Sequence, residues 1–254
     1  MVPKIAGIRI IRLKKTGSTN DYLAELLRSD PDIENGTVVS ADYQERGRGL
    51  GDHTWESEQL KNLLFSLYYK PHALNPHHQF YLNMAVALAV QSFIESMLMD
   101  QRIAIKWPND LYINDQKTGG MLIQHTVSGP RVMHSIIGIG LNVNQLRFMS
   151  NAPNPVSMRH FLDHDLNLDD CLNEVCHELD RYLFMLEQSA FQSIKSRYLS
   201  VLYGMEVLRR YKYGGELIEA RIKGITDYGM LVLEKTDGMR IECELNEIKF
   251  MIDC

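Results

Sequence analysis

The chain has 254 residues, 45% of them hydrophobic and 23% charged, which is enough to bury one sizeable core and a small second one. Lys and Arg number 27 against 32 Asp and Glu, a formal net charge of −5, so a general nucleic-acid-binding surface is disfavoured. The longest apolar stretch, Met84 to Val90, is far short of the roughly 20 residues that span a bilayer. The sequence thus predicts no nucleic-acid and no membrane partner.

The cysteines indicate a reducing compartment. Cys171, Cys176, Cys243 and Cys254 form no CxxC pair and have no His at zinc-ligand spacing. The N-terminus carries no apolar stretch followed by small, cleavable residues. We therefore predict a reduced, cytoplasmic protein.

In chain order, the first part of the sequence predicts alternating strands and helices. These elements are a strand at 8–13, a helix starting at Ser18 or Thr19, a strand at 36–41, a loop at 45–54, a strand at 62–69 and a helix at 80–99. Either hydroxyl, that of Ser18 or of Thr19, can cap the first helix by accepting from its first turn. The loop (ERGRGLGDHT) holds three glycines and one aliphatic side chain, so it should be mobile.

The next part predicts a meander, two helices and a hairpin-rich tail. Short strands are expected at 103–106, 111–114, 120–126 and 132–140, helices at 168–186 and 191–202, and strands near 205–212, 217–226, 230–235 and 239–245. Connections this short favour antiparallel pairing. We predict an α+β fold in which a mixed, largely antiparallel sheet packs with helices in residues 1–204, followed by a small β-barrel in 205–254.

Three segments suit an anionic substrate. The GRG at 47–49 lacks the spacing of a dinucleotide fingerprint, but backbone N–H groups around an Arg can bind an anion; a flexible surface loop is the alternative. The KWPND at 106–110 places a cation beside a potential metal-ligating carboxylate, and Lys117 follows, although either lysine alone could be a solvated turn charge. Gly138 and Gly140 fit either a ligand ring close to the backbone or tight packing.

In this order the segments resemble the catalytic domain of the biotin protein ligases, also called biotin–acetyl-CoA-carboxylase ligases. The resemblance runs through GSTN at 17–20, Gln44 with GRG at 47–49 and WES at 55–57, NLLFS at 62–66, KWPND at 106–110, KTGGMLI at 117–123 and GIGLN at 138–142. The tail from about Met205 resembles, by pattern, the small SH3-like C-terminal domain of that family. The implied architecture is the biotin/lipoate ligase catalytic fold with an SH3-like β-barrel after it.

The resemblance also implies a reaction. In this family the carboxylate of biotin attacks the α-phosphate of ATP, giving biotinyl-5′-AMP and pyrophosphate. A lysine of the biotin carboxyl carrier protein then takes the biotinyl group. For this chain, biotin and ATP are thus expected as substrates, Mg²⁺ as an aid to the first step and the carrier protein as partner; whether the protein is a homodimer stays open.

Carried over by motif, the implied site has two sides. Biotin or its adenylate is expected to contact Ser18, Thr19, Asn20, Gln44, Gly47, Arg48, Gly49, Leu50, Lys117, Gly138 and Gly140. Within this set the residues Ser18, Thr19 and Gln44 should hydrogen-bond the ureido ring, and the glycines at 138 and 140 should line its pocket. The nucleotide side is expected to comprise Trp55, Lys106, Asn109 and Asn142, with Asp110 as a ligand of Mg²⁺.

Two residues are implied to be catalytic. Arg48, with the backbone around Gly49, should hold the carboxylate and the α-phosphate, and Lys117 should stabilise the charge that develops during both steps. One departure concerns the residues after GRG, where Leu50, Gly51, Asp52 and His53 replace further basic residues of the family. Less positive charge there predicts weaker retention of the adenylate.

Three other classes of protein share parts of this pattern. Lipoate protein ligases share the fold, but GRG followed by Trp55, together with KWPND, is the biotin-type arrangement. A bifunctional ligase and repressor carries an N-terminal helix-turn-helix domain, for which a Ser-Thr-Asn motif at residue 18 leaves no room. A catalytically dead biotin-binding module should lack Lys117 or Arg48, and both are present.

Overall fold

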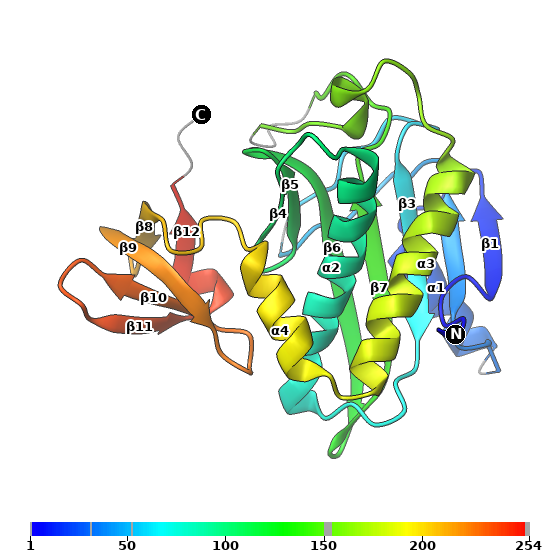
Figure 1. The fold of residues 1–254 in the computed structure, drawn as a ribbon. Helices are drawn as coiled ribbons and strands as arrows, with labels where there is room; N and C mark the ends of the chain where they lie inside the picture. The colour runs from blue at the N-terminus through cyan, green and yellow to red at the C-terminus, as the bar shows by residue number, and fades with distance from the viewer. Residues whose placement is uncertain (1, 31, 52, 150–153, 252–254) are drawn as a thin grey trace.

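The computed structural model describes residues 2–30, 32–51, 53–149 and 154–251, which build two β-sheets and four α-helices (Figure 1). Predictions that fall on Asp52 and Cys254 lie outside these residues. The other three cysteines are free and buried. Burial raises the pKa of Cys171 and Cys243 to about 11 and that of Cys176 to about 12, so these thiols stay protonated as core residues.

The larger sheet is mixed and largely antiparallel, as predicted. Its strands are β1 (Arg9–Leu13), β2 (Thr37–Ala41), β3 (Leu63–Tyr69), β4 (Ile103–Lys106), β5 (Asp110–Ile113), β6 (Gln116–Ser128) and β7 (Arg131–Leu141). Their order is β1-β2-β3-β7-β6-β5-β4, and β1 with β2 forms the parallel pair because a helix crosses between them. The GIGLN segment thus lies on a central strand, and KWPND lies at the sheet edge.

Helices cover both faces of this sheet. They are α1 (Thr19–Ser29), α2 (Gln79–Met97), α3 (Leu168–Glu187) and α4 (Phe191–Ser200), with short 3₁₀ turns at Pro76–His78, Met158–Phe161 and Leu245–Glu247. Side chains alternate along each strand, so Val38 and Ile137 pack in the main core with α2, whereas Val39 and Ile136 pack with Leu23 of α1. Figure 1 shows α2, α3 and α4 on one face and α1 behind the sheet.

One helical stretch of the described chain, Pro76–Met97, is long and apolar enough to cross a membrane. However, 78% of its most apolar window is buried inside the protein. Residues 84–90 are all buried within it, which agrees with the prediction of a core helix. Since α3 and α4 pack against it, α2 is apolar nearly all round for reasons of packing.

The tail forms a second, five-stranded antiparallel sheet of order β11-β10-β9-β8-β12. The strands are β8 (Leu208–Tyr213), β9 (Glu216–Ile225), β10 (Leu231–Lys235), β11 (Arg240–Cys243) and β12 (Ile248–Phe250). The hairpins agree with the predicted pattern, but the short strand β12 was missed. The domain boundary at 204/205 stays a prediction; the first strand of this sheet begins at Leu208.

The turn between β9 and β10 attaches this sheet to the rest of the molecule. Trp107 Nε1 donates to the carbonyl oxygen of Gly229 at 2.9 Å. The carboxylate of Asp227 accepts from Tyr81 Oη at 2.7 Å and from Lys195 Nζ at 2.8 Å. The KWPND turn is therefore braced by residues 226–230, which we call the docking turn.

Candidate active site

A polar network lies where α1 meets the sheet. The backbone N and Oγ1 of Thr19 both donate to Gln44 Oε1, at 2.7 and 3.0 Å. Ser66 Oγ lies 2.7 Å from Thr19 Oγ1 and 2.6 Å from Asn20 Oδ1. Ser18 occupies the N-cap position of α1, one of the two predicted, but the expected hydrogen bond from the first turn to its hydroxyl is absent. The structure thus brings Thr19 and Asn20 of the STN motif together with Gln44 and Ser66, and the role of these side chains towards a ureido ring stays a prediction.

The glycines of β7 are covered by side chains from this network and from the loop. A Cβ on Gly138 would overlap the amide of Asn20, and a Cβ on Gly140 would lie 2.7 Å from the indole ring of Trp55. Asn20 Nδ2 also donates to the carbonyl oxygen of Leu122 at 3.1 Å. Tight packing, the alternative that the sequence left open, therefore accounts for both glycines. A ligand ring would have to share this strip with Trp55.

Lys106, Asp110 and Lys117 form a charged cluster next to Trp55. Lys117 Nζ lies 2.6 Å from Asp110 Oδ1 and 5.9 Å from the centre of the Trp55 ring. Lys106 Nζ lies 3.9 Å from the other carboxylate oxygen. Burial lowers the pKa of Lys106, with a smaller contribution of the same sign from Lys117 and an opposing one from Asp110. Two cations around one carboxylate leave a net positive charge, which suits an anion.

This cluster does not fit the predicted metal site. Each oxygen of Asp110 faces a lysine, so a cation bound there would have to displace an ammonium group. Within the ranges that the structure describes, no three His, Cys, Asp or Glu side chains come together as metal ligands. Mg²⁺ commonly binds through substrate phosphates with few protein ligands, so its arrival with ATP needs no such group.

Two buried polar atoms beside the cluster have no hydrogen-bond partner in the described part of the chain. They are Trp55 Nε1, a donor, and Asn142 Oδ1, an acceptor, whereas Asn142 Nδ2 donates to Val156 O at 3.1 Å. Asn109 Nδ2 is engaged by the carbonyl oxygen of Met121 at 2.6 Å. Buried groups without partners are rare in folded proteins. Trp55 and Asn142 therefore have hydrogen-bonding capacity left for a substrate, and Asn109 has a structural bond.

The glycine-rich loop folds onto its own end. Gly49 N donates to His53 O at 2.7 Å, and Trp55 N donates to Gly47 O at 2.9 Å. A Cβ on Gly47 would lie 2.6 Å from Trp55 O, so this close approach explains the glycine. Because the N–H of Gly49 is already used, it does not form the expected anion site in this conformation.

Arg48 is not part of the charged cluster. Its Nη1 lies 2.7 Å from Asp21 Oδ1, and both side chains are about half exposed (51% and 55%). Exposed ion pairs of this kind contribute about 0 to 1 kcal/mol, so the pair can be exchanged for a substrate anion at small cost. The sequence did not single out Asp21, because no local pattern links it to a residue so far along the chain.

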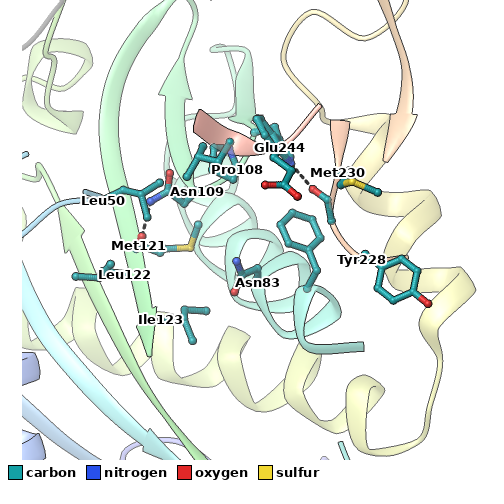
Figure 2. A pocket seen from close by; sticks show the side chains of 14 residues that line it. Leu50, Asn83, Pro108, Asn109, Met121, Leu122, Ile123, Tyr228, Met230 and Glu244 are labelled. Carbon is teal, nitrogen blue, oxygen red and sulfur yellow. Dashed lines mark hydrogen bonds between the residues drawn. The ribbon is translucent and has the colours of Figure 1, made fainter. Parts of the chain in front are cut away.

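A cavity of about 520 Å³ opens between the two sheets, next to the site (Figure 2). Its lining combines the loop, the KWPND turn, β6 and the docking turn, with Leu50, Asn109, Met121 and Gly229 as representatives. Leu50 thus faces a largely apolar wall. Asn83 of α2 also lines the cavity, and its Oδ1 is buried without a partner among the described residues.

Sequence reasoning gave no role to Asn83 and Ser66, although a signal was present for both. Each is a small polar residue in an otherwise apolar run, LLFSLYY for Ser66 and QFYLNMAVALAV for Asn83. A polar side chain inside such a run has to find a partner or a solvent-filled space when the run is buried. Ser66 makes hydrogen bonds in the STN network, and Asn83 lines the cavity.

Comparison with known proteins gives a consistent picture. The biotin/lipoate A/B protein ligase family model matches residues 12–142. The bifunctional ligase/repressor BirA of Bacillus subtilis is 30% identical, over 93% of this chain and 73% of its own length. A biotin–acetyl-CoA-carboxylase ligase of Paracoccus denitrificans is 26% identical, over 90% of this chain and 95% of its own. The structure of a biotin protein ligase from Aquifex aeolicus with biotin and ATP superposes with a TM-score of 0.78, at 24% identity, covering 97% of this chain and 100% of that one.

Proposed function

This chain belongs to the biotin/lipoate A/B protein ligase family, and we propose that it uses ATP to attach biotin to a lysine of a carrier protein. The enzyme is a biotin protein ligase, and biotin and ATP are its substrates. The finer assignments that follow, of residues, acceptor and location, are proposals.

In the first step, a carboxylate oxygen of biotin bonds to the α-phosphorus of ATP, and the bond to the bridging oxygen of pyrophosphate breaks. Negative charge builds on the α-phosphate as this happens. Lys117 and Lys106, held on either side of Asp110, supply preorganised positive charge there. Arg48 exchanges Asp21 for the carboxylate or phosphate.

In the second step, the amine of the acceptor lysine bonds to the acyl carbon, the bond from that carbon to the phosphate oxygen breaks, and AMP leaves as the amine loses a proton. The developing oxyanion again needs a positive neighbour, and Lys117 provides it. We propose the biotin carboxyl carrier protein as acceptor and the cytoplasm as location. A homodimer stays a prediction.

One observation carries the residue assignments: motifs scattered over residues 17–142 meet on one face of the large sheet. Thr19 and Gln44 form a network of donors and acceptors, Gly138 and Gly140 lie in the middle under Asn20 and the flat ring of Trp55, and Lys117 stands at the other end of the strip. A bicyclic urea with a carboxylate tail needs hydrogen bonds at one end, contact with a flat surface in the middle and a cation at the other end.

The test is pyrophosphate release by the purified chain with ATP, Mg²⁺ and either biotin or lipoate. We expect release with biotin at least about tenfold faster than with lipoate, since the binding pocket pairs ureido groups that lipoate lacks. A carrier domain added next should gain biotin only in the complete mixture. Faster release with lipoate would reject the biotin assignment.

A further inference from the structure

Lys106 is a mostly buried cation with a long ion-pair contact. Its side chain is 16% exposed, and its Nζ lies 3.9 Å from Asp110, at the outer limit of such a pair. Asp110 makes its short contact, at 2.6 Å, with Lys117 instead. An ammonium group removed from water needs other favourable electrostatic contacts if it is to stay charged and in place.

Aromatic rings supply such contacts, and the nearer ring comes from the second sheet. Lys106 Nζ lies 4.6 Å from the centre of the Phe250 ring and 5.9 Å from that of Tyr112. A cation within about 6 Å of a ring centre is attracted by the negative face of the ring, and more strongly when desolvated. Tyr211 packs edge-on against Phe250, with ring centres 5.2 Å apart at 72°, and so fixes the orientation of that ring.

We propose that Phe250 is a positioning residue for the ATP-dependent step, which acts by holding the ammonium group of Lys106 beside Asp110. Through this contact the second sheet completes a site whose other proposed residues all lie within residues 17–142. The proposal rests on the proposed function, because that function places Lys106 next to the nucleotide.

The surroundings of Lys106 explain why an aromatic ring is needed at position 250. With Phe250 removed, the ammonium group of Lys106 would keep only Asp110 and the more distant Tyr112. It would then compete with Lys117 for the single carboxylate, or turn towards solvent. Either change disturbs the charge that faces ATP and leaves the Thr19 and Gln44 network untouched.

The first experiment compares Phe250→Leu with Phe250→Tyr in biotin-dependent pyrophosphate release. We expect Phe250→Leu to lower kcat/KM for ATP by about five- to tenfold, the size of a partly desolvated cation–π contact, with KM for biotin unchanged. Phe250→Tyr keeps the ring and should stay within about twofold of wild type. Ile248→Ala, a substitution at a buried residue two positions earlier on the same strand, is the control for general damage to the sheet.

A double-mutant cycle shows whether Phe250 acts through Lys106. In a Lys106→Met background, which removes the charge but keeps an unbranched chain, Phe250→Leu should cost less than about twofold in kcat/KM for ATP. An equal loss in both backgrounds would overturn the proposal, as would an equal loss in Ile248→Ala. Wild-type kinetics in Phe250→Leu would overturn it too.

Two further measurements test the proposal even if Phe250→Leu folds poorly or if the proposed reaction is wrong. Trifluorophenylalanine at position 250 keeps the ring shape but weakens its negative face, so it should reproduce most of the Phe250→Leu loss; full activity would overturn the proposal. Independently of catalysis, the ring should shift the ε-methylene resonance of Lys106 upfield, and Phe250→Leu should remove the shift. An upfield shift in a wild-type protein without biotin-dependent activity would refute the proposed function and keep the contact; a missing shift would refute the contact.

Discussion

Asp110 is shared by two lysines, and at the scale of single residues this makes Lys117 the most consequential side chain of the site. Lys117→Ala removes the cation that lies 5.9 Å from the centre of the Trp55 ring. It should slow biotinyl-adenylate formation by about 10²- to 10³-fold, the loss seen when one preorganised group is taken from a site of this kind. Pyrophosphate release measures it. A circular-dichroism melt should show a folded protein, and near wild-type release by such a protein would exclude Lys117 from the mechanism.

The cross-strand glycines Gly120 and Gly140 offer a matched pair of substitutions. A Cβ on Gly140 would press on the Trp55 ring at 2.7 Å, whereas one on Gly120 would reach the same ring at 3.5 Å, an ordinary contact. We expect Gly140→Ala to weaken biotin binding by at least about tenfold, because a shifted ring closes the strip, and Gly120→Ala to have a small effect. Calorimetric titration with biotin checks this; equal losses in both variants would contradict it.

Candidate residues of the site could be picked out in the sequence, but the partners of these residues in the fold could not. KWPND and KTGGMLI indicated cations near a carboxylate, and the cluster of Lys106, Asp110 and Lys117 agrees with that expectation. The pairing of Arg48 with Asp21, or of Lys106 with Phe250, depends on how distant segments meet after folding. No periodicity or spacing in the sequence indicates contacts between segments that lie so far apart in the chain.

At the scale of elements, the described part of the loop 45–54 is tied to the segment before α1 at its start, where the backbone N–H groups of Glu45 and Arg46 donate to the carbonyl oxygens of Thr16 and Gly17. Its glycine-rich part is held chiefly by its own turn, through the hydrogen bonds from Gly49 to His53 and from Trp55 to Gly47. We expect amide hydrogen exchange in this loop to be fast in the free enzyme and at least about tenfold slower with biotin and ATP, because closure over the adenylate orders it and excludes water. The hairpin turn around Gly238, remote from the site, is the internal control. Unchanged exchange in the loop would reject this prediction.

The long hairpin of β6 and β7 should make stability depend on pH. Burial lowers the pKa of His125 from 6.5, and Ser135 Oγ lies 2.8 Å from its Nδ1. Burial also lowers the pKa of His134. The unfolded chain therefore binds protons first as the pH falls below about 6.5, so the folded state loses stability in that range.

Replacing His125 by Gln, which keeps a polar side chain without a titrating group, should flatten this acid loss but not abolish it, since His134 remains. Urea unfolding at about pH 7.5, 6 and 5 measures the slope of the unfolding free energy against pH. An unchanged slope in His125→Gln would show that the imidazole is not the responsible group.

Element positions were predicted well where the pattern was long, as in α2 and α3, and less well at short strands. β6 begins at Gln116 instead of the predicted residue 120, so Lys117 already lies within the strand. β12 has only three residues and is a strand because it pairs with Tyr211 to Tyr213 of β8. Strand formation that depends on a distant partner leaves no local signal.

At the scale of the molecule, the docking turn holds the second sheet against the part of the chain that carries the site. Gly229 has φ +89°, and a Cβ there would overlap the ring of Phe80. Gly238 has φ +86° in a similar turn with nothing within 4 Å of its Cβ position. We expect Gly238→Ala to lower the free energy of unfolding by about 1 kcal/mol from backbone strain alone, and Gly229→Ala by roughly 2 to 4 kcal/mol.

Thermal unfolding measures the loss of stability in each variant, and ATP kinetics measure the effect of each substitution on the site. Only Gly229→Ala should raise KM for ATP, because only this turn holds Trp107 and, through it, Lys106 to Asp110. Equal destabilisation by both substitutions would mean that the contact with Phe80 carries no energy. A change in KM for Gly238→Ala would mean that strain anywhere in the sheet reaches the site.

The docking turn also bears on how the chain folds during synthesis. Trp107 and Phe80 emerge from the ribosome more than a hundred residues before Gly229, the backbone that they will contact. Until then, two large aromatic side chains beside the nascent site stay uncovered, and such surfaces attract other unfolded chains. A ribosome stalled before residue 226 should therefore hold a chain that binds chaperones, and release from them should coincide with the appearance of a working ligase.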